Sequence, residues 1–205
     1  PETRAAMIDE LGLVAARCDG IRCDMAMLLM NEVFERTWRD FPREGTPPAR
    51  EFWGEAIAQT KRQHPDCLFL AEVYWDLEAT LQNLGFDYTY DKRLYDLLLA
   101  RDPGAVQTHL LERPPGFVSR SAHFLENHDE VRIASRLDPA EHAAAAWLML
   151  SLPGMRLLQD GQLPGARLRT RVQWARRPIE PAVDEIQSMY SRLLQATQSG
   201  AVGQN

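Results

Sequence analysis

The chain has 205 residues, of which 45% are hydrophobic and 25% charged, a balance typical of a globular protein with a sizeable core. Its net charge of −6 is spread along the sequence without a basic tract, which argues against nucleic acid as the main partner and against a polybasic membrane surface. The longest apolar run, residues 143–152, has about half the length that a membrane-spanning helix needs.

Helical and strand patterns alternate along the chain. Apolar residues at helical spacing predict helices over 4–17, 50–63, 77–84, 93–100, 105–111, 141–150 and 183–196. Short apolar segments predict strands over 18–24, 67–74, 86–90, 122–125 and 155–158. A polar, proline-rich stretch from Arg39 to Arg50 follows the first of these strands. Because strands alternate with helices of this length, the sequence predicts an α/β fold with a parallel sheet flanked by helices.

Acidic residues end three of the predicted strands. Asp24 ends the first strand, Glu72 the second, and Asp129 lies at the end of the fourth. In parallel α/β sheets, ligands bind at the carboxyl ends of the strands. We therefore expect the three carboxylates to face one pocket.

The neighbours of two of these acids predict different environments. Arg22 and Asp24 are two residues apart, so they share one face of a strand, and the arginine favours the charged form of the aspartate. Glu72 follows leucines on its own face, and an apolar setting favours a protonated carboxyl group. Two carboxyl groups with opposed environments are typical of the acid and nucleophile in glycoside hydrolysis.

Three motifs then resemble a known family. DGIRCDMA (19–26), FLAEVYW (69–75) and FLENHDE (124–130), in this order, resemble the second, third and fourth sequence regions of the alpha-amylase family, glycoside hydrolase family thirteen. LPGMRLLQDGQ (152–162) is similar to its eighth barrel strand. The resemblance covers about residues 5–165 and implies a partial (β/α)8 TIM barrel, approximately strands four to eight.

The resemblance also implies a role for each acid. Asp24 would be the nucleophile that forms a covalent glycosyl–enzyme intermediate, and Glu72 the general acid/base. Asp129 would hold sugar hydroxyls and stabilise the transition state.

Three further residues would bind the substrate. By the same resemblance, Arg22 orients Asp24 and His128 binds the sugar in the reacting subsite. Tyr74, just after Glu72, is expected to stack on a sugar ring at the rim of the pocket.

The activity implied is that of a retaining glycoside hydrolase acting on α-glucosidic bonds of α-glucans or α-glucosides. A transglycosidase or glucoside isomerase of the same fold is an alternative, since the intermediate is shared. A catalytically silent carbohydrate-binding or scaffold homologue is another, although the presence of all three acids argues against it.

Some features depart from the family pattern. Met25 follows the nucleophile where the family usually has alanine, and Leu28 stands where starch-degrading members carry a basic or polar residue. The residues before Asp24 read as a helix, so the first three barrel strands and the first motif are not found. We therefore interpret residues 1–205 as a single domain, the C-terminal part of a catalytic barrel, whose sugar site is incomplete on its own.

No cofactor and no metal are predicted. The cluster Glu126, His128, Asp129 and Glu130 has no second group to support a metal site, and no glycine loop could cradle phosphate. Three cysteines without a framework spacing predict free, buried thiols and favour a cytoplasmic location. The expected partner is the carbohydrate substrate, and the oligomeric state is left open.

Overall fold

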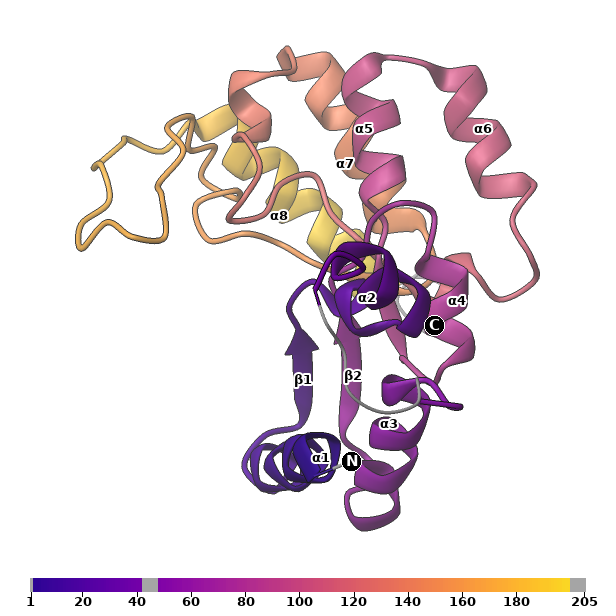
Figure 1. Ribbon diagram of the computed structural model, residues 1–205. Coiled ribbons are helices and arrows are strands. Elements are labelled where there is room, and N and C mark those ends of the chain that lie inside the picture. The colour runs from indigo at the N-terminus through magenta and orange to yellow at the C-terminus, as the bar shows by residue number, and fades with distance from the viewer. Residues whose placement is uncertain (1, 42–47, 200–205) are drawn as a thin grey trace. The chain divides into compact units, whose positions relative to one another are not determined.

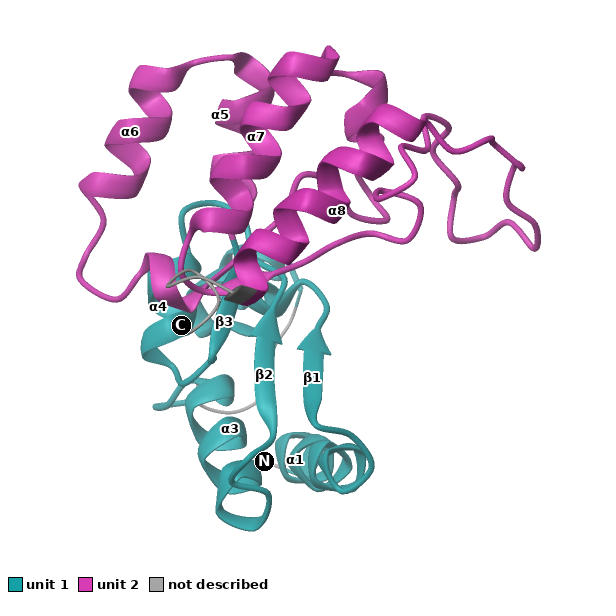
Figure 2. Cartoon of the chain, turned by 180° about the vertical axis from the view of Figure 1, so that it is seen from behind, with its two compact units in different colours: residues 1–90 teal, residues 91–205 magenta. Residues whose placement is uncertain are grey.

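The computed structural model describes residues 2–41 and 48–199. It divides into two compact units, residues 1–90 (unit 1) and residues 91–205 (unit 2), coloured separately in Figure 2. The predicted proline-rich stretch 39–50 lies partly outside the described residues.

Unit 1 is a three-stranded parallel sheet with helices packed on one face. Its elements are α1 (Glu2–Ala15), β1 (Gly20–Cys23), the 3₁₀ helix η1 (Ala26–Leu29), α2 (Asn31–Thr37), α3 (Phe52–Gln63), β2 (Leu68–Ala71), α4 (Glu78–Asn83) and β3 (Tyr88–Tyr90) (Figure 1). β2 lies between β1 and β3, and both of its pairings are parallel. Helix α1 packs against α3.

Alternation along the strands gives the sheet of unit 1 two different faces. Cys23 and Ala71 are paired across β1 and β2 and are buried in the core that also contains Phe69 and residues of α3. On the other face, Arg22 is paired with Leu70, and both are half-buried. One face of each strand therefore builds the core, and the other carries the residues predicted to be functional.

Gly85 sets the exit from α4. Its φ of +110° lies where only glycine is comfortable, and a Cβ there would meet Ile57 Cγ2 at 3.3 Å. The predicted end of this helix at Gly85 is confirmed, since α4 ends at Asn83.

Unit 2 is mainly helical. Its elements are α5 (Lys92–Ala100), α6 (Pro103–Leu111), η2 (Val118–Arg120), β4 (Ser121–His123), η3 (Ile133–Ser135), α7 (Pro139–Ser151), β5 (Met155–Arg156) and α8 (Asp184–Ser199). β4 and β5 pair in parallel, with Ala122 opposite Met155. Helices α7 and α8 pack together, as Figure 2 shows, around buried side chains that include Met149 and Tyr190.

Side chains fix the helix starts in unit 2. Asp91 accepts a hydrogen bond from Leu94 N at the start of α5, and Asp102 accepts one from Ala105 N at the start of α6. Asp138 and Glu141 form a reciprocal capping box at the start of α7. Each cap satisfies backbone N–H groups that have no partner within their own helix.

The predicted helices and strands all overlap observed ones, but the bounds differ. The strands are shorter than predicted: β1 ends at Cys23 and β2 at Ala71, while β4 ends at His123, well before Asp129. Asp24 and Glu72 directly follow their strands, whereas Asp129 lies in a loop.

Unit 1 contains one helix that the sequence did not predict and one cysteine whose expected burial is wrong. Helix α2 was not predicted: it has only seven residues, fewer than the about 11–18 over which helical periodicity is read, and only Val33 on it is buried. Cys18 is exposed rather than buried, while Cys23 and Cys67 are buried as predicted. In residues 2–41 and 48–199, no helix has the length and apolarity needed to cross a membrane.

Candidate active site

In unit 1, parallel pairing continues past the ends of β1 and β2. Glu72 N donates to Cys23 O at 3.0 Å, and Ala26 N donates to Glu72 O at 2.9 Å. These bonds keep the chain after β1 in register with the chain after β2. They place Asp24 and Glu72 on neighbouring segments at the same edge of the sheet.

A single guanidinium contacts both acids. Arg22 Nη1 forms an ion pair with Asp24 Oδ1 and donates a hydrogen bond to it. Arg22 Nη2 lies 2.9 Å from Glu72 Oε2, an ion-pair distance, although its N–H groups do not point at a hydrogen-bond acceptor in the described part of the chain. The predicted pairing of Arg22 with Asp24 is confirmed. The pairing of Arg22 with Glu72 was not predicted from the sequence.

Arg22 is itself held on the sheet. Its Cζ lies 5.8 Å from the ring centroid of Tyr90, over the ring face. Burial lowers the pKa of Arg22, but hydrogen bonds with Tyr90 and Asp24 raise it, and the net value lies above the ordinary one. The guanidinium is thus a permanent cation between the two carboxyl groups.

The two acids differ sharply in exposure. The Asp24 side chain is 76% exposed, whereas that of Glu72 is 4% exposed. The expectation that the carboxyl group of Glu72 is in an apolar setting is wrong, because Oε2 accepts a hydrogen bond from Met25 N at 2.9 Å and Oε1 accepts one from Tyr74 Oη at 2.8 Å. Glu72 is therefore buried but oriented through both oxygens.

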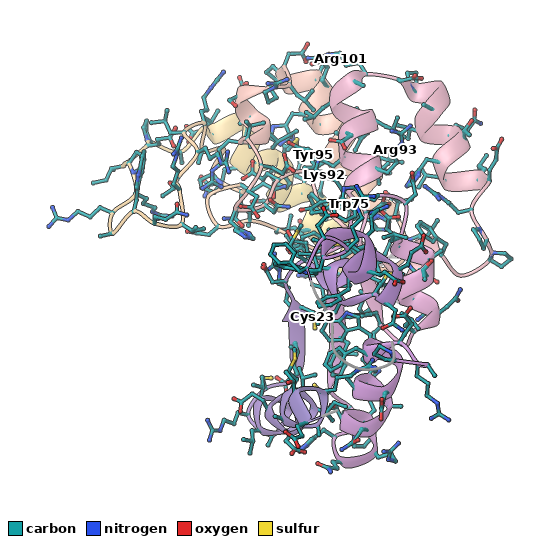
Figure 3. All side chains as sticks on the ribbon, viewed as in Figure 1. Cys23, Trp75, Lys92, Arg93, Tyr95 and Arg101 are labelled. Atoms are coloured by element: carbon teal, nitrogen blue, oxygen red, sulfur yellow. The ribbon has the colours of Figure 1, made fainter. Side chains whose placement is uncertain are left out.

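Left-handed backbone occurs within five residues of the ends of β1 and β2. Met25 has a φ of 44°, and Trp75 and Asp76 have φ values of 66° and 58°. Such values cost a non-glycine residue on the order of 1–3 kcal/mol and occur preferentially at functional sites. Trp75, labelled in Figure 3, is exposed, and the Arg36 guanidinium lies 5.9 Å from its ring centroid.

In unit 2, His128 and Asp129 form a second predicted part of the site. His128 Nε2 lies 3.1 Å from Asp129 Oδ2, and both side chains are partly exposed. Asn127 Oδ1 accepts hydrogen bonds from Asp129 N at 2.9 Å and from Glu130 N at 3.1 Å. Asn127 thereby shapes the turn on which His128 and Asp129 sit.

Sequence reasoning missed the function of Glu126, which closes this loop. Its carboxylate is fully buried and accepts hydrogen bonds from Arg132 Nη1 at 2.7 Å and from Ile133 N at 2.6 Å. Arg132 Nη1 also donates to Asp160 O at 2.7 Å. Burial raises the pKa of Glu126, and the hydrogen bonds from Arg132 and Ile133 oppose this shift. The sequence signal for this ion pair was an acid that directly follows the apolar pair 124–125 and precedes an arginine by six residues.

A buried cluster of Asp91, His109 and His123 was also missed. Asp91 Oδ1 lies 2.8 Å from His109 Nε2, and Asp91 Oδ2 lies 3.1 Å from His123 Nδ1. Burial raises the pKa of Asp91, but hydrogen bonds from the two histidines outweigh this effect and hold it below its usual range. The three residues are 18 and 32 positions apart in sequence and follow no recognisable spacing.

Glu130 has a structural partner. Lys92 Nζ lies 3.4 Å from Glu130 Oε1 and 4.8 Å from the ring centroid of Tyr95, and Figure 3 shows Lys92 and Tyr95 together on α5. Burial raises the pKa of Tyr95.

Nowhere in the described part of the chain do three or more His, Cys, Asp or Glu side chains gather closely enough to hold a metal ion.

The structure thus joins Arg22, Asp24, Glu72 and Tyr74 within unit 1, and His128 and Asp129 within unit 2. That all three acids face one pocket stays a prediction.

Comparison with solved structures defines the fold. A debranching enzyme from Nostoc punctiforme superposes with a TM-score of 0.74 at 20% identity, over 98% of this chain and 45% of that chain. A cyclic α-maltosyl-(1→6)-maltose hydrolase from Arthrobacter globiformis gives 0.75 at 19% identity, over 98% and 45%. An alpha-amylase from H. orenii gives 0.69 at 20% identity, over 98% and 48%. The predicted fold, part of a (β/α)8 barrel, is confirmed.

Sequence comparison adds a relative. The chain is 28% identical over 200 residues to Alpha-amylase MalA of Haloarcula japonica, covering 94% of this chain and 26% of that protein. No family model matches the chain. The chain resembles the alpha-amylase family in sequence as well as in fold, which confirms the resemblance drawn from its three motifs. It spans about a quarter of this curated relative and less than half of the solved structures.

Proposed function

We propose that the protein is a glycoside hydrolase of alpha-amylase type that cleaves α-glucosidic bonds of α-glucans or α-glucosides with retention of configuration. The observation that supports this most is the guanidinium of Arg22 between an exposed Asp24 and a buried Glu72. Alpha-amylase MalA and the debranching enzyme are consistent with an α-glucan substrate. In this proposal, residues 1–205 supply approximately strands four to eight of a catalytic barrel.

Asp24 is the proposed nucleophile. Arg22 engages Oδ1, which leaves Oδ2 for attack on the anomeric carbon. The bond from Asp24 to that carbon forms as the glycosidic C–O bond breaks, through an oxocarbenium-like transition state. The high exposure of the Asp24 side chain gives a sugar access to it.

Glu72 is the proposed general acid/base. It gives its proton to the departing glycosidic oxygen, and it then takes a proton from the water that displaces Asp24 from the sugar. Met25 N and Tyr74 Oη hold its two oxygens, so the proton is delivered from a fixed position. In this proposal the ring of Tyr74 also stacks on a sugar ring at the rim of the pocket.

His128 and Asp129 are the proposed sugar-binding pair. Asp129 accepts hydrogen bonds from sugar hydroxyls and stabilises the developing positive charge, while His128 donates to the same ring. Their mutual contact and the turn made by Asn127 orient both side chains.

Trapping of the intermediate tests the proposal. The full-length protein would be incubated with a fluorinated α-glucosyl fluoride, digested and examined by mass spectrometry. We expect one glycosyl adduct, on Asp24, and none in the variant Asp24→Asn. A protein that binds maltooligosaccharides but forms no adduct would be a silent homologue, and an adduct on another residue would contradict the assigned nucleophile.

A further inference from the structure

Both ring nitrogens of His123 face hydrogen-bond acceptors. The side chain is fully buried at the end of β4. Nδ1 lies 3.1 Å from Asp91 Oδ2. Nε2 lies 3.0 Å from Pro153 O and 3.2 Å from Val118 O.

These partners decide the protonation state of the ring. The backbone carbonyls can only accept hydrogen bonds, and an ionised Asp91 can also only accept. A neutral imidazole has one N–H, so one nitrogen would direct its lone pair at an oxygen about 3 Å away. Only an imidazolium, with an N–H at both nitrogens, satisfies every contact.

The second histidine of the cluster is neutral by the same reasoning. Nδ1 of His109 lies 3.2 Å from Arg113 Nη2, a group that can only donate, so this nitrogen accepts. The proton is therefore on Nε2, which donates to Asp91 Oδ1. Asp91 is left to balance the positive charge of His123.

Other charged groups lie on the elements around His123. Arg156 occupies the paired position on β5, and Arg120 belongs to η2, the 3₁₀ helix that begins at Val118. Both are cations and oppose a positive ring. Asp91 is the anion whose contact with the ring compensates for this repulsion.

The backbone around His123 fits closely. Gly154 has a φ of +109°, and a Cβ there would lie 2.5 Å from Ser121 O and 3.4 Å from His123 Nε2. Only glycine allows the turn before β5 to approach the ring in this way. The ring therefore connects the start of α5, the end of β4 and the turn that leads into β5.

The segment after His123 is continuously buried up to the proposed sugar-binding pair. Phe124 stacks on Tyr95 with ring centroids 5.7 Å apart, Leu125 is in the core, and Glu126 binds Arg132. Because packed segments transmit displacements, a shift at His123 moves the turn that carries Asp129.

We propose that His123 is kept as a buried imidazolium and acts as a positioning residue for His128 and Asp129. This inference rests on the proposed function for its effect on activity, but the protonation state of the ring does not depend on it. Loss of one proton breaks the contact with Asp91 or with the carbonyls and releases the end of β4.

The protonation state is tested on the unmodified protein. Long-range ¹H–¹⁵N NMR spectra report the protonation of each imidazole nitrogen, and the five histidines can be assigned by elimination with His→Gln variants at the other four positions. At pH 7.5 we expect two protonated nitrogens at His123 and only Nε2 protonated at His109. An unprotonated nitrogen at His123 would overturn the inference.

The positioning role is tested by the pH dependence of kcat. We expect His123→Gln to lower kcat by on the order of 10- to 100-fold with little change in KM, as a small misplacement of binding groups does. In the unmodified protein the alkaline fall of kcat should contain, besides the part caused by deprotonation of the acid Glu72, a part that coincides with loss of the second His123 proton in the NMR titration. Only this second part should be absent from His123→Gln.

His109→Gln is the matched control, because it alters the neutral histidine of the same cluster. It should keep both parts of the alkaline fall of kcat. An equal loss of kcat at every pH in His123→Gln would show a merely structural role and overturn the positioning part. An unmodified protein without glycosidase activity would instead contradict the proposed function. The NMR spectra would still decide whether His123 is an imidazolium, because that measurement does not depend on activity.

Discussion

At the scale of single residues, the site in unit 1 depends on the shape of one side chain. The guanidinium of Arg22 presents separate nitrogens to Asp24 and to Glu72, and it lies over the ring of Tyr90. An ammonium group is a point charge that lacks this planar geometry. The residue type matters here as much as the charge.

Arg22→Lys should therefore lower kcat by on the order of 100-fold, because one or both carboxyl groups lose their orientation. The measurement is kcat and KM on an aryl α-glucoside, with thermal unfolding as a check on the fold. Arg93→Lys, on the exposed Arg93 of α5 in unit 2, is the control and should change neither. A rise in KM with unchanged kcat would contradict this account of Arg22.

At the scale of elements, the loop between β4 and η3 is held by a buried ion pair. Glu126 and Arg132 are both almost inaccessible to solvent, and each also bonds the backbone, through Ile133 N and Asp160 O. Removing the charge of one partner leaves the other buried without compensation.

Glu126→Gln should destabilise the protein by roughly 3 kcal/mol, the cost of breaking a buried pair. Urea unfolding monitored by tryptophan fluorescence would measure this change. Glu112→Gln, at an exposed position after α6, should have little effect. Equal stability of the two variants would show that the loop does not depend on the pair.

Helices α7 and α8 provide a pH-dependent contribution to stability. His142 Nε2 lies 2.9 Å from Tyr190 Oη, and burial lowers the pKa of His142 to about 4. An unfolded histidine has a pKa near 6.5, so the unfolded chain binds the proton first as the pH falls. The contribution of His142 is complete above about pH 6.5 and is lost progressively towards about pH 4.

We therefore expect the free energy of unfolding to fall by roughly 3 kcal/mol between pH 7.5 and pH 4 on account of His142. Denaturant unfolding at several pH values measures this slope. The variant His142→Gln should show a correspondingly shallower slope, and identical slopes in the two proteins would contradict the assignment.

At the scale of the whole molecule, the sequence predicts the order of elements better than the contacts at the site. Apolar periodicity and the motifs around Asp24 and Glu72 place both acids at strand ends, since register and side-chain parity are local properties. The donors around Glu72 were not foreseen, because the left-handed backbone of Met25 is not encoded in any periodic pattern.

Contacts between residues that are distant in sequence could not be predicted either. The partners of Asp91 lie 18 and 32 positions away, and nothing in composition or spacing joins them. Such features depend on tertiary structure rather than on local sequence.

We propose that Asp24 and Glu72 divide the roles of nucleophile and acid/base, and azide rescue of the two alanine variants distinguishes these roles. With an activated aryl α-glucoside as substrate, Glu72→Ala should give the α-glucosyl azide, because azide displaces Asp24 from the intermediate. Asp24→Ala should give the β-glucosyl azide, because azide then attacks the substrate itself. The opposite pattern, or the same anomer from both variants, would contradict the assignment.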